Sequence, residues 1–312
     1  MPAKQGLEVP SATPKIGLAL GGGGARGLAH IAILEAFDEL GIKPAQIAGT
    51  SIGALIGAAY AGGISAAEIR AHAERILVNR RELIRRILAD PEMNLRQLFG
   101  LRPPLGAAID GRVLVRTALP PGIPDRIEEF SIPFTAVATD FYGRRAHPLM
   151  RGPVVPTLAA SIALPGLISP QRLGNVILID GGITNPLPFD LLHHVDIVVA
   201  VDVTGRPISR PGRMPSMPEL LFRSSMIMQH HLVQANIERS PPDILVVPEV
   251  DEIRVLEFFR LPQILRQTQP AKEDVKRKLD AILNGRPARR RRPSPPQSSA
   301  GRRRSAGPGY SA

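Results

Sequence analysis

The pentapeptide Gly49-Thr50-Ser51-Ile52-Gly53 (G-T-S-I-G) guides the interpretation of the whole chain. It has the form G-x-S-x-G, with a short apolar run before it and a segment of small residues, 54–60, after it. This context predicts a strand, a sharp turn and a helix. A serine at such a turn has a strained backbone, and its hydroxyl lies at a helix N-terminus, where the helix dipole stabilises negative charge. Ser51 is therefore a candidate nucleophile, although the pattern alone also arises by chance in a chain rich in glycine and alanine.

A second glycine-rich loop lies upstream of this motif. Residues 16–20 (I-G-L-A-L) form an apolar run typical of a buried strand, and they lead directly into the loop at 21–27 (G-G-G-G-A-R-G). Apolar residues at helical spacing over 28–40 predict a helix, which Gly41 ends. Together with a strand at Ile47-Ala48, these elements form a β-α-β unit, which predicts parallel strands.

The glycine loop has more than one possible use. Gly22, Gly24 and Gly27 match G-x-G-x-x-G, the loop of dinucleotide-binding folds. That use requires an acidic residue about 20 positions further on, at the end of the second strand, and here that strand ends without a carboxylate. The loop also lacks the G-K-[ST] sequence of a P-loop. The remaining use is an oxyanion hole, in which backbone N–H groups converge on a negative oxygen beside a helix N-terminus.

The third motif is Asp180-Gly181-Gly182, which follows the apolar run at 176–179. An aspartate at the carboxyl end of a strand lies where open α/β sheets place their sites. Asp-Gly pairs are also common in turns of no functional consequence, and Asp110-Gly111 is another such pair in this chain. The two differ in context, because Asp180 follows a clean buried strand and Asp110 follows an irregular segment rich in proline and glycine.

The remaining patterns indicate alternating strands and helices. Short apolar runs predict further strands at 132–140, 196–203 and 243–247. Helices are expected at 66–86, 160–165 (ended by Pro165), 217–239 and 272–283. This alternation predicts an α/β fold with a mostly parallel sheet.

No charged residue occurs in the 24 positions between Lys43 and Glu68. That length would suit a membrane span. The segment 45–64 is nevertheless rich in glycine and poor in leucine, isoleucine and valine, so we expect a buried helix packed closely on the sheet.

Basic charge is concentrated in the last 28 residues. The chain has 312 residues and a net charge of +11; residues 285–312 hold eight arginines and no acid, which leaves +3 for the rest. This tail, rich in proline, serine and glycine, is expected to be disordered and able to bind an anionic membrane, with nucleic acid as the less favoured partner. A solvated tail without a partner is the alternative. We expect a flexible lead at 1–14 and a catalytic domain at 15–284.

Two further features bear on where the protein acts. Residues 1–14 lack an apolar signal-peptide core, and the chain has no cysteine, which excludes disulfides and thiolate chemistry. We expect a cytoplasmic protein with peripheral membrane contact. The segment 75–102 carries seven arginines, and it is either a solvated helical excursion or a cap that touches lipid near the active site.

The three motifs occur in a fixed order. G-G-G-x-R-G at 22–27, G-T-S-I-G about 25 residues later and D-G-G far downstream resemble the patatin-like phospholipases, particularly the bacterial stand-alone type, over about residues 15–205. The stretches 138–140 (A-T-D) and 160–165 (A-S-I-A-L-P) are also similar to that family. The resemblance implies a three-layer α/β/α fold with a central, mostly parallel sheet. It also implies hydrolysis of phospholipids or other acyl-ester lipids by a Ser/Asp dyad, without metal or other cofactor.

Carried over by motif, the resemblance implies that Ser51 is the nucleophile and Asp180 its base. Gly22, Gly23 and Gly24 would form the oxyanion hole, with Arg26 beside it. The remaining motif glycines are Gly27, Gly49, Gly53, Gly181 and Gly182.

The chemistry of such a dyad makes one demand on its surroundings. A serine hydroxyl needs a base within hydrogen-bond reach to attack an ester, and the attack leaves an acyl group on Ser51 that water later removes. An aspartate with a pKa of about 3.9 is a weak base, so burial must raise the pKa of Asp180.

Three other functions remain open from the sequence. A Ser-His-Asp esterase would satisfy the chain order Ser…Asp…His with His193, His194, His230 or His231, but these pairs have helical context and no evident strand-end loop. A non-catalytic, membrane-associated regulator with the same fold is a second alternative. A nucleotide-binding protein is a more distant third.

Overall fold

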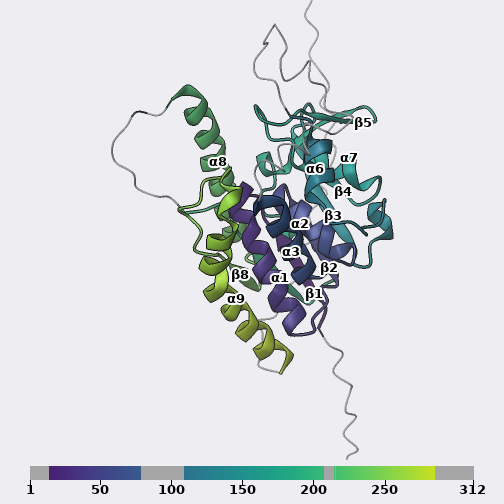
Figure 1. Cartoon of the computed structure of the whole chain (residues 1–312), viewed down its shortest axis with the longest axis vertical. Coiled ribbons are helices and arrows are strands. Elements are labelled where there is room, and N and C mark those ends of the chain that lie inside the picture. The colour runs from purple at the N-terminus through teal and green to yellow at the C-terminus, as the bar shows by residue number, and fades with distance from the viewer. Residues whose placement is uncertain (1–13, 79–108, 207–213, 215, 285–312) are drawn as a thin grey trace, which may run out of the picture.

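The computed structural model describes residues 14–78, 109–206, 214 and 216–284, and these ranges hold a central mixed sheet (Figure 1). Its strands are β1 (Ile16–Leu20), β2 (Gln46–Thr50), β3 (Phe134–Asp140), β4 (Arg145–Leu149), β5 (Gln171–Leu173), β6 (Val176–Asp180), β7 (Ile197–Val201) and β8 (Ile244–Val246). Their order is β5-β6-β3-β2-β1-β7-β8, and β4 pairs with β3 outside this path. The strands β3, β2, β1, β7 and β8 are parallel, whereas β4 and β6 run antiparallel to β3.

Helices cover both faces of this sheet. They are α1 (Ala29–Glu39), α2 (Ile52–Ala61), α3 (Ala66–Val78), α6 (Gly111–Ala118), α7 (Val154–Ser161), α8 (Met217–Arg239) and α9 (Leu261–Leu283). Short 3₁₀ turns complete the described elements: η1 (Gly24–Leu28), η2 (Ile127–Glu129), η3 (Gly181–Ile183), η4 (Phe189–Leu191) and η5 (Phe258–Arg260).

The side chains of β1 alternate between the two faces of the sheet, which explains why helices cover both faces. Leu18 and Leu20 point to the face covered by α1, α2 and α9, whereas Ala19 points to the opposite face, where it packs with Phe189 and with Val233 of α8. Successive side chains of a strand face opposite sides of the sheet, so one buried strand requires cover on both sides. The expected three-layer α/β/α arrangement with a mostly parallel sheet is confirmed.

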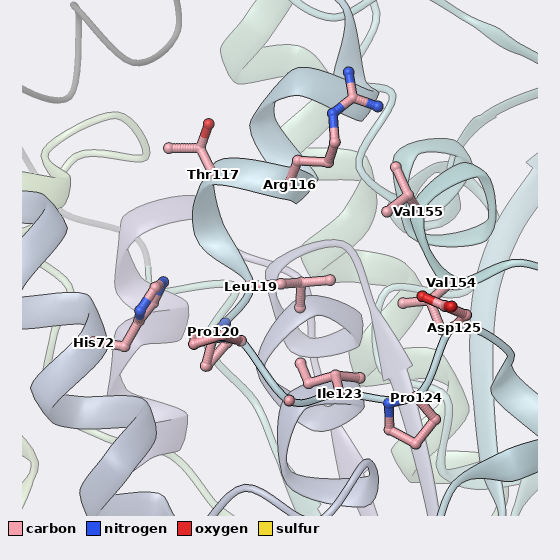
Figure 2. Close-up of a pocket in the computed structure, with 12 residues that line it drawn as sticks. His72, Arg116, Thr117, Leu119, Pro120, Ile123, Pro124, Asp125, Val154 and Val155 are labelled. Carbon is pink, nitrogen blue, oxygen red and sulfur yellow. The ribbon is translucent and has the colours of Figure 1, made fainter. Parts of the chain in front are cut away.

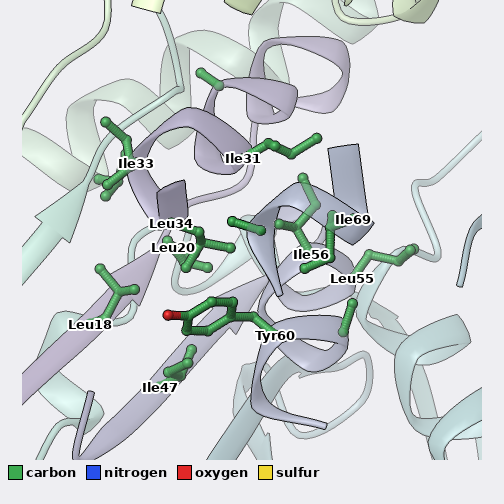
Figure 3. Close-up of a cluster of buried hydrophobic side chains, with 14 of the residues drawn as sticks. Leu18, Leu20, Ile31, Ile33, Leu34, Ile47, Leu55, Ile56, Tyr60 and Ile69 are labelled. Atoms are coloured by element: carbon green, nitrogen blue, oxygen red, sulfur yellow. The ribbon is translucent and has the colours of Figure 1, made fainter. Parts of the chain in front are cut away.

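The main core lies between the sheet and α1, α2 and α3 (Figure 3). Aliphatic side chains from strands and helices interdigitate there, and Figure 3 shows Tyr60 among them, close to Leu18 and Ile47. The Tyr60 hydroxyl donates a 2.6 Å hydrogen bond to Asp38 of α1, which satisfies its one polar atom at the edge of the core.

Helix α9 is attached to α1 by charged side chains as well as apolar ones. Lys272, whose side chain is 9% exposed, lies 2.9 Å from a carboxylate oxygen of Glu35 and 2.6 Å from one of Glu39. Lys276 contacts the other oxygen of Glu39 at 2.8 Å. Both acids lie on the α1 face that α9 covers, so this cluster fixes how the two helices pack.

Two predicted elements have the predicted bounds, and the bounds of others differ. The strand at 16–20 and the helix at 217–239 are confirmed with the predicted bounds. The last helix begins at Leu261 rather than 272, because Pro262 lies in its first turn and Pro270 is accommodated inside it. The helix predicted at 160–165 instead spans Val154–Ser161 and ends before Pro165. Antiparallel strands β4 and β5 were not predicted.

Several predictions fall on residues outside the described ranges. These are nearly all of the lead predicted at 1–14, most of the arginine-rich segment at 75–102, the end of the helix predicted at 66–86, and the tail at 285–312. For the described residues, no helix combines the length and the apolarity needed to cross a bilayer. The uncharged stretch 45–64 forms β2 and the buried helix α2, as expected.

Candidate active site

Ser51 occupies a strained turn between β2 and α2. Its φ is 54° and its ψ is −122°, in a region that non-glycine residues rarely adopt. The turn is tight because strand and helix touch: a Cβ atom at Gly49 would lie 2.6 Å from the Gly53 carbonyl oxygen. The result is a partly exposed serine side chain at the N-terminus of α2, as the G-x-S-x-G motif predicts.

The Ser51 hydroxyl contacts Asp180 directly, with 2.7 Å between Ser51 Oγ and Asp180 Oδ2. Asp180 ends β6, and its neighbour in the sheet is Ala138 of β3. The second carboxylate oxygen, Oδ1, accepts a 2.7 Å hydrogen bond from the Gly182 N–H. The motifs G-T-S-I-G and D-G-G, 129 residues apart, therefore meet at one point.

Burial makes Asp180 a stronger base than an ordinary aspartate. Its side chain is 4% exposed, and desolvation raises its pKa from 3.8 to about 6, because burial disfavours the charged form. Hydrogen bonds from Ser51 and Gly182 oppose this shift but do not cancel it. This elevation is what the sequence argument required of a carboxylate that acts as a base.

Thr139 holds the backbone of Asp180 and is itself contacted by Thr184. The Thr139 hydroxyl donates a 2.9 Å hydrogen bond to the Asp180 carbonyl oxygen and lies 2.8 Å from the Thr184 hydroxyl. Asp140 itself has a turn role, because its carboxylate accepts the Gly143 N–H in the β3–β4 hairpin. Of the stretch 138–140, Thr139 is thus the residue that supports the site.

Ser161, the last residue of α7, contacts the Ser51 backbone. Ser161 Oγ accepts a 3.0 Å hydrogen bond from the Ser51 N–H and donates a 2.6 Å hydrogen bond to the Val137 carbonyl oxygen. Its side chain is fully buried. The sequence analysis noted Ser161 only within a family-like stretch, and no local signal could have linked it to a residue 110 positions away.

The glycine loop lies beside Ser51, with one of its predicted donors already in use. A Cβ atom at Gly22 would lie 3.4 Å from Ser51 Cβ, which places the loop at the serine. The Gly22 N–H, however, donates to the Pro186 carbonyl oxygen at 2.9 Å. Among the described residues, the N–H groups of Gly23 and Gly24 donate to no other group. Of the three predicted oxyanion-hole donors, Gly22, Gly23 and Gly24, the last two are therefore the remaining candidates.

Gly24 requires its glycine. Its φ is 59°, and a Cβ atom there would overlap the backbone and side chain of Val255. The next N–H in the loop, that of Ala25, donates to the Val255 carbonyl oxygen at 2.7 Å. Contacts with a distant segment thus fix the path of the loop.

Arg26 and His30 position the loop from within the protein. Arg26 is 8% exposed, and its Nε donates to the Gly23 carbonyl oxygen at 3.5 Å. Desolvation lowers the pKa of Arg26, while the charges of Asp251 and Asp202 oppose that shift. The fully buried His30 contacts the Gly21 carbonyl oxygen at 2.8 Å, and burial lowers its pKa to about 4. Arg26 thus contacts the carbonyl side of the loop rather than its N–H donors.

The histidines of the alternative triad do not stand between Ser51 and Asp180, because these two side chains contact each other. His193 lies near the amino end of β2, the end opposite Ser51, where its backbone N–H donates a hydrogen bond to the side chain of Gln46. The helical context predicted for His193 and His194 is wrong, since both lie in an exposed loop. His230 and His231 are in α8, as predicted.

A cavity of about 530 Å³ lies away from the dyad (Figure 2). Its walls come from α3, α6, the loop after α6 and the first turn of α7. Ser161 is at the other end of α7, about 10 Å further along the helix axis. The described residues also contain no cluster of three His, Asp or Glu side chains suited to a metal ion. The dyad and its glycine loop are therefore the candidate active site.

Comparisons with known proteins identify relatives of this chain. Uncharacterized NTE family proteins of Mycobacterium bovis and Mycobacterium tuberculosis are 38% identical over 208 residues, which is 66% of this chain and 54% of theirs. The lysophospholipase NTE1 of Saccharomyces cerevisiae is 26% identical over 274 residues, 80% of this chain and 16% of the relative. The chain thus spans about half the length of the mycobacterial relatives and a smaller part of the yeast protein.

The solved structure of VipD from Legionella pneumophila aligns with a TM-score of 0.47 and 13% identity, over 88% of this chain and 67% of that one. A family model described as patatin-like phospholipase matches residues 18–193, a range that includes the glycine loop, Ser51 and Asp180. This chain belongs to the patatin-like phospholipase family.

Proposed function

We propose that this protein hydrolyses acyl esters of lipids through a Ser51/Asp180 dyad. The observation that carries the proposal is the 2.7 Å contact between the Ser51 hydroxyl and a buried carboxylate whose pKa is raised to about 6. A base with that pKa is ionised at neutral pH and is basic enough to accept a proton in the transition state. The Ser51 and Asp180 side chains contact each other directly, without an intervening imidazole.

The reaction proceeds in two halves. Asp180 takes the hydroxyl proton as Ser51 Oγ attacks the ester carbonyl, and the N–H groups of Gly23 and Gly24 stabilise the oxyanion. Collapse of the tetrahedral intermediate releases the alcohol, which takes the proton from Asp180, and leaves an acyl group on Ser51. Asp180 then accepts a proton from the water that attacks the acyl-enzyme. Collapse of the second tetrahedral intermediate returns this proton to Ser51 Oγ and releases the fatty acid.

A lipid substrate is supported by family membership and by the yeast relative, which is named a lysophospholipase. We therefore place phospholipids and lysophospholipids first among the acyl esters to test. The hydrolase reading is preferred over a regulator that keeps only the fold, because a regulator has no need of an elevated carboxylate pKa beside a strained serine.

The direct test is labelling by a fluorophosphonate, which phosphonylates activated serines. The wild-type protein should be labelled at Ser51, and Ser51→Ala should abolish both labelling and release of fatty acid from lysophosphatidylcholine. Ser131→Ala is the control, because the Ser131 hydroxyl also donates a hydrogen bond, to the Ala61 carbonyl oxygen, but lies outside the site. Labelling that persists in Ser51→Ala would remove Ser51 from the mechanism.

We also propose that residues 285–312 tune binding to anionic membranes without contributing to the chemistry. Eight arginines without an acid can attract such a surface, each by at most about 1 kcal/mol, and salt weakens the attraction. Deleting the tail should leave hydrolysis of a soluble ester unchanged and weaken binding to anionic vesicles, most strongly at low salt. A parallel titration with DNA tests the rival partner, and unchanged vesicle binding would contradict the proposal.

A further inference from the structure

Most of the large apolar side chains that are strongly exposed in the described chain lie in three segments, 141–142, 214–228 and 256–259. Examples are Tyr142 at 78% exposure, Leu221 at 68% and Leu256 at 58%. Isolated exposed apolar residues are ordinary on a soluble surface, but a shared location requires an explanation.

The first segment lies just beyond the dyad along β3. Val137 of this strand pairs with Thr50, the residue before Ser51, and Ala138 pairs with Asp180. Phe141 follows Ala138 by three residues, about 10 Å along the strand. The exposed tip of the hairpin therefore projects from the same edge of the sheet as Ser51.

The second segment is the exposed side of α8. Gln229 of this helix lies so close to the D-G-G turn that a Cβ atom at Gly182 would be 3.0 Å from its amide oxygen. Leu221 and Met228 are exposed and seven positions apart, so they share one face of the helix, and Leu220 and Ile227 repeat the spacing beside them. Figure 1 shows α8 at one side of the molecule and the β3–β4 region at the other side.

The third segment adjoins the oxyanion loop. Val255 contacts Gly24 and accepts the Ala25 N–H, and Leu256 is the next residue. The three exposed segments, widely separated in sequence, thus each adjoin a different part of the candidate active site: Asp180, the D-G-G turn and the glycine loop.

We propose that these three segments form a rim around the active site that docks on a lipid bilayer. The inference rests on the proposed function, because a lipid ester has to pass from the bilayer to Ser51. A protein or a second copy seated on the rim would cover the entrance to Ser51, whereas a bilayer there supplies the substrate. The exposed Arg144 and Arg145 beside Phe141 and Tyr142 favour an anionic surface, and aromatic side chains suit the membrane interface.

The chain contains no tryptophan, so a single introduced tryptophan reports on contact with lipid. We would place it at Tyr142, Leu221 or Leu256, in the Ser51→Ala background that prevents hydrolysis, and add vesicles of phosphatidylcholine with phosphatidylglycerol. Fluorescence should shift to the blue and be quenched by brominated lipid at all three positions. Arg277→Trp is the control, because that side chain is 75% exposed on the later half of α9, away from the rim.

Two results would overturn the proposal. One is an unchanged spectrum at all three positions at a saturating concentration of the vesicles. The other is a blue shift that grows with protein concentration in the absence of lipid, which would assign the rim to a second copy of the chain. Because binding is measured without turnover, loss of the proposed chemistry would not affect this experiment.

Kinetics give a second, independent readout. The double variant Phe141→Ser/Tyr142→Ser should raise the apparent KM for vesicles about tenfold and leave kcat/KM for a soluble short-chain ester unchanged. Leu220→Ser/Leu221→Ser should behave in the same way. An equal loss on both substrates would mean that these residues support the chemistry or the fold rather than the bilayer.

Discussion

The edge of the sheet around Ser51 and the interface between α1 and α9 follow opposite physical rules. At the interface, Lys272 is enclosed by Glu35 and Glu39, and apolar residues fill the space around them. At the edge, Ser51 has a positive φ, and the buried Asp180 carboxylate contacts the Ser51 hydroxyl and the Gly182 N–H but no cation of the described residues. One region is optimised for stability, and the other retains strain and desolvated charge.

This difference indicates where the free energy of folding is gained and where part of it is lost. A buried carboxylate costs stability when it ionises, and a strained φ costs about 1–3 kcal/mol. Packing elsewhere has to offset both terms. Substitutions should therefore separate into two classes, those that lower activity and those that lower stability.

Asp180→Asn should give the largest difference between the effect on activity and the effect on stability. An amide cannot accept the serine proton, so kcat should fall by about 10²–10⁴-fold. In the folded protein the pKa of Asp180 is raised from 3.8 to about 6, so its ionisation costs stability that is absent below pH 3.8 and complete above pH 6. The variant should thus be more stable than wild type at pH 8, by on the order of 3 kcal/mol, and nearly equal to it near pH 4. Urea unfolding at both pH values measures this; a less stable variant at pH 8 would contradict it.

Gly24→Ala should be the next most damaging change. A methyl group there would force the loop away from Val255 and turn the N–H that we propose as an oxyanion donor, at a cost of about 10²–10³-fold in kcat. Gly41→Ala is matched to it, because Gly41 also has a positive φ, 65°, but no atom lies within 4 Å of its Cβ position. The control should lose about 1 kcal/mol of stability and keep its activity. Equal activity of the two variants would exclude the loop from catalysis.

The pH dependence of hydrolysis should follow Asp180. With a pKa of about 6, kcat/KM for a soluble ester should be flat above pH 7 and fall tenfold per unit well below pH 6, as the base is protonated. His30 cannot give this profile, because burial lowers its pKa to about 4. The profile of His30→Gln checks the assignment, and a midpoint that moves in this variant would implicate the histidine.

Ser161→Ala should have a smaller effect. Loss of the hydroxyl removes the acceptor that holds the Ser51 N–H, and we expect kcat to fall about tenfold with KM unchanged. Unfolding experiments at the assay temperature should show that the variant remains folded. A rise in KM with unchanged kcat would argue against a positioning role for Ser161.

Lys272→Met should leave kcat unchanged and lower stability. The methionine fills similar space but leaves Glu35 and Glu39 without their shared cation, which should cost about 1–3 kcal/mol. Lys278→Met is the control, because its pair with Asp274 is exposed and pairs of that kind contribute less than about 1 kcal/mol. A similar loss of stability in both variants would mean that burial of Lys272 is irrelevant.

Sequence patterns predicted the elements whose signal is local. The apolar run at 16–20 and the long helix at 217–239 need only neighbouring residues for their recognition, and both have the predicted bounds. Strand β4 (R-A-H-P-L) is polar and contains Pro148, which is tolerated because it lies at an edge, paired only with β3. Nothing in its composition distinguishes it from a loop.

The candidate site was predictable as motifs but not as a network. Ser51 and Asp180 were identified from local patterns, whereas the use of the Gly22 N–H depends on the Pro186 carbonyl oxygen, which is distant in sequence. The Ser161 contact and the shared location of the apolar rim likewise depend on how separate segments meet. Such properties belong to the tertiary structure and have no counterpart in a short stretch of sequence.

The pairing of α1 with α9 has a consequence for protein synthesis. Lys272 and Glu35 are 237 positions apart, and Val275 and Leu279 belong to the same buried cluster as Ile33 and Phe37. On the ribosome, the side of α1 that α9 covers therefore remains exposed until every strand of the sheet has been translated. Chains in that interval expose surface that favours aggregation, so we expect them to need a chaperone until α9 emerges.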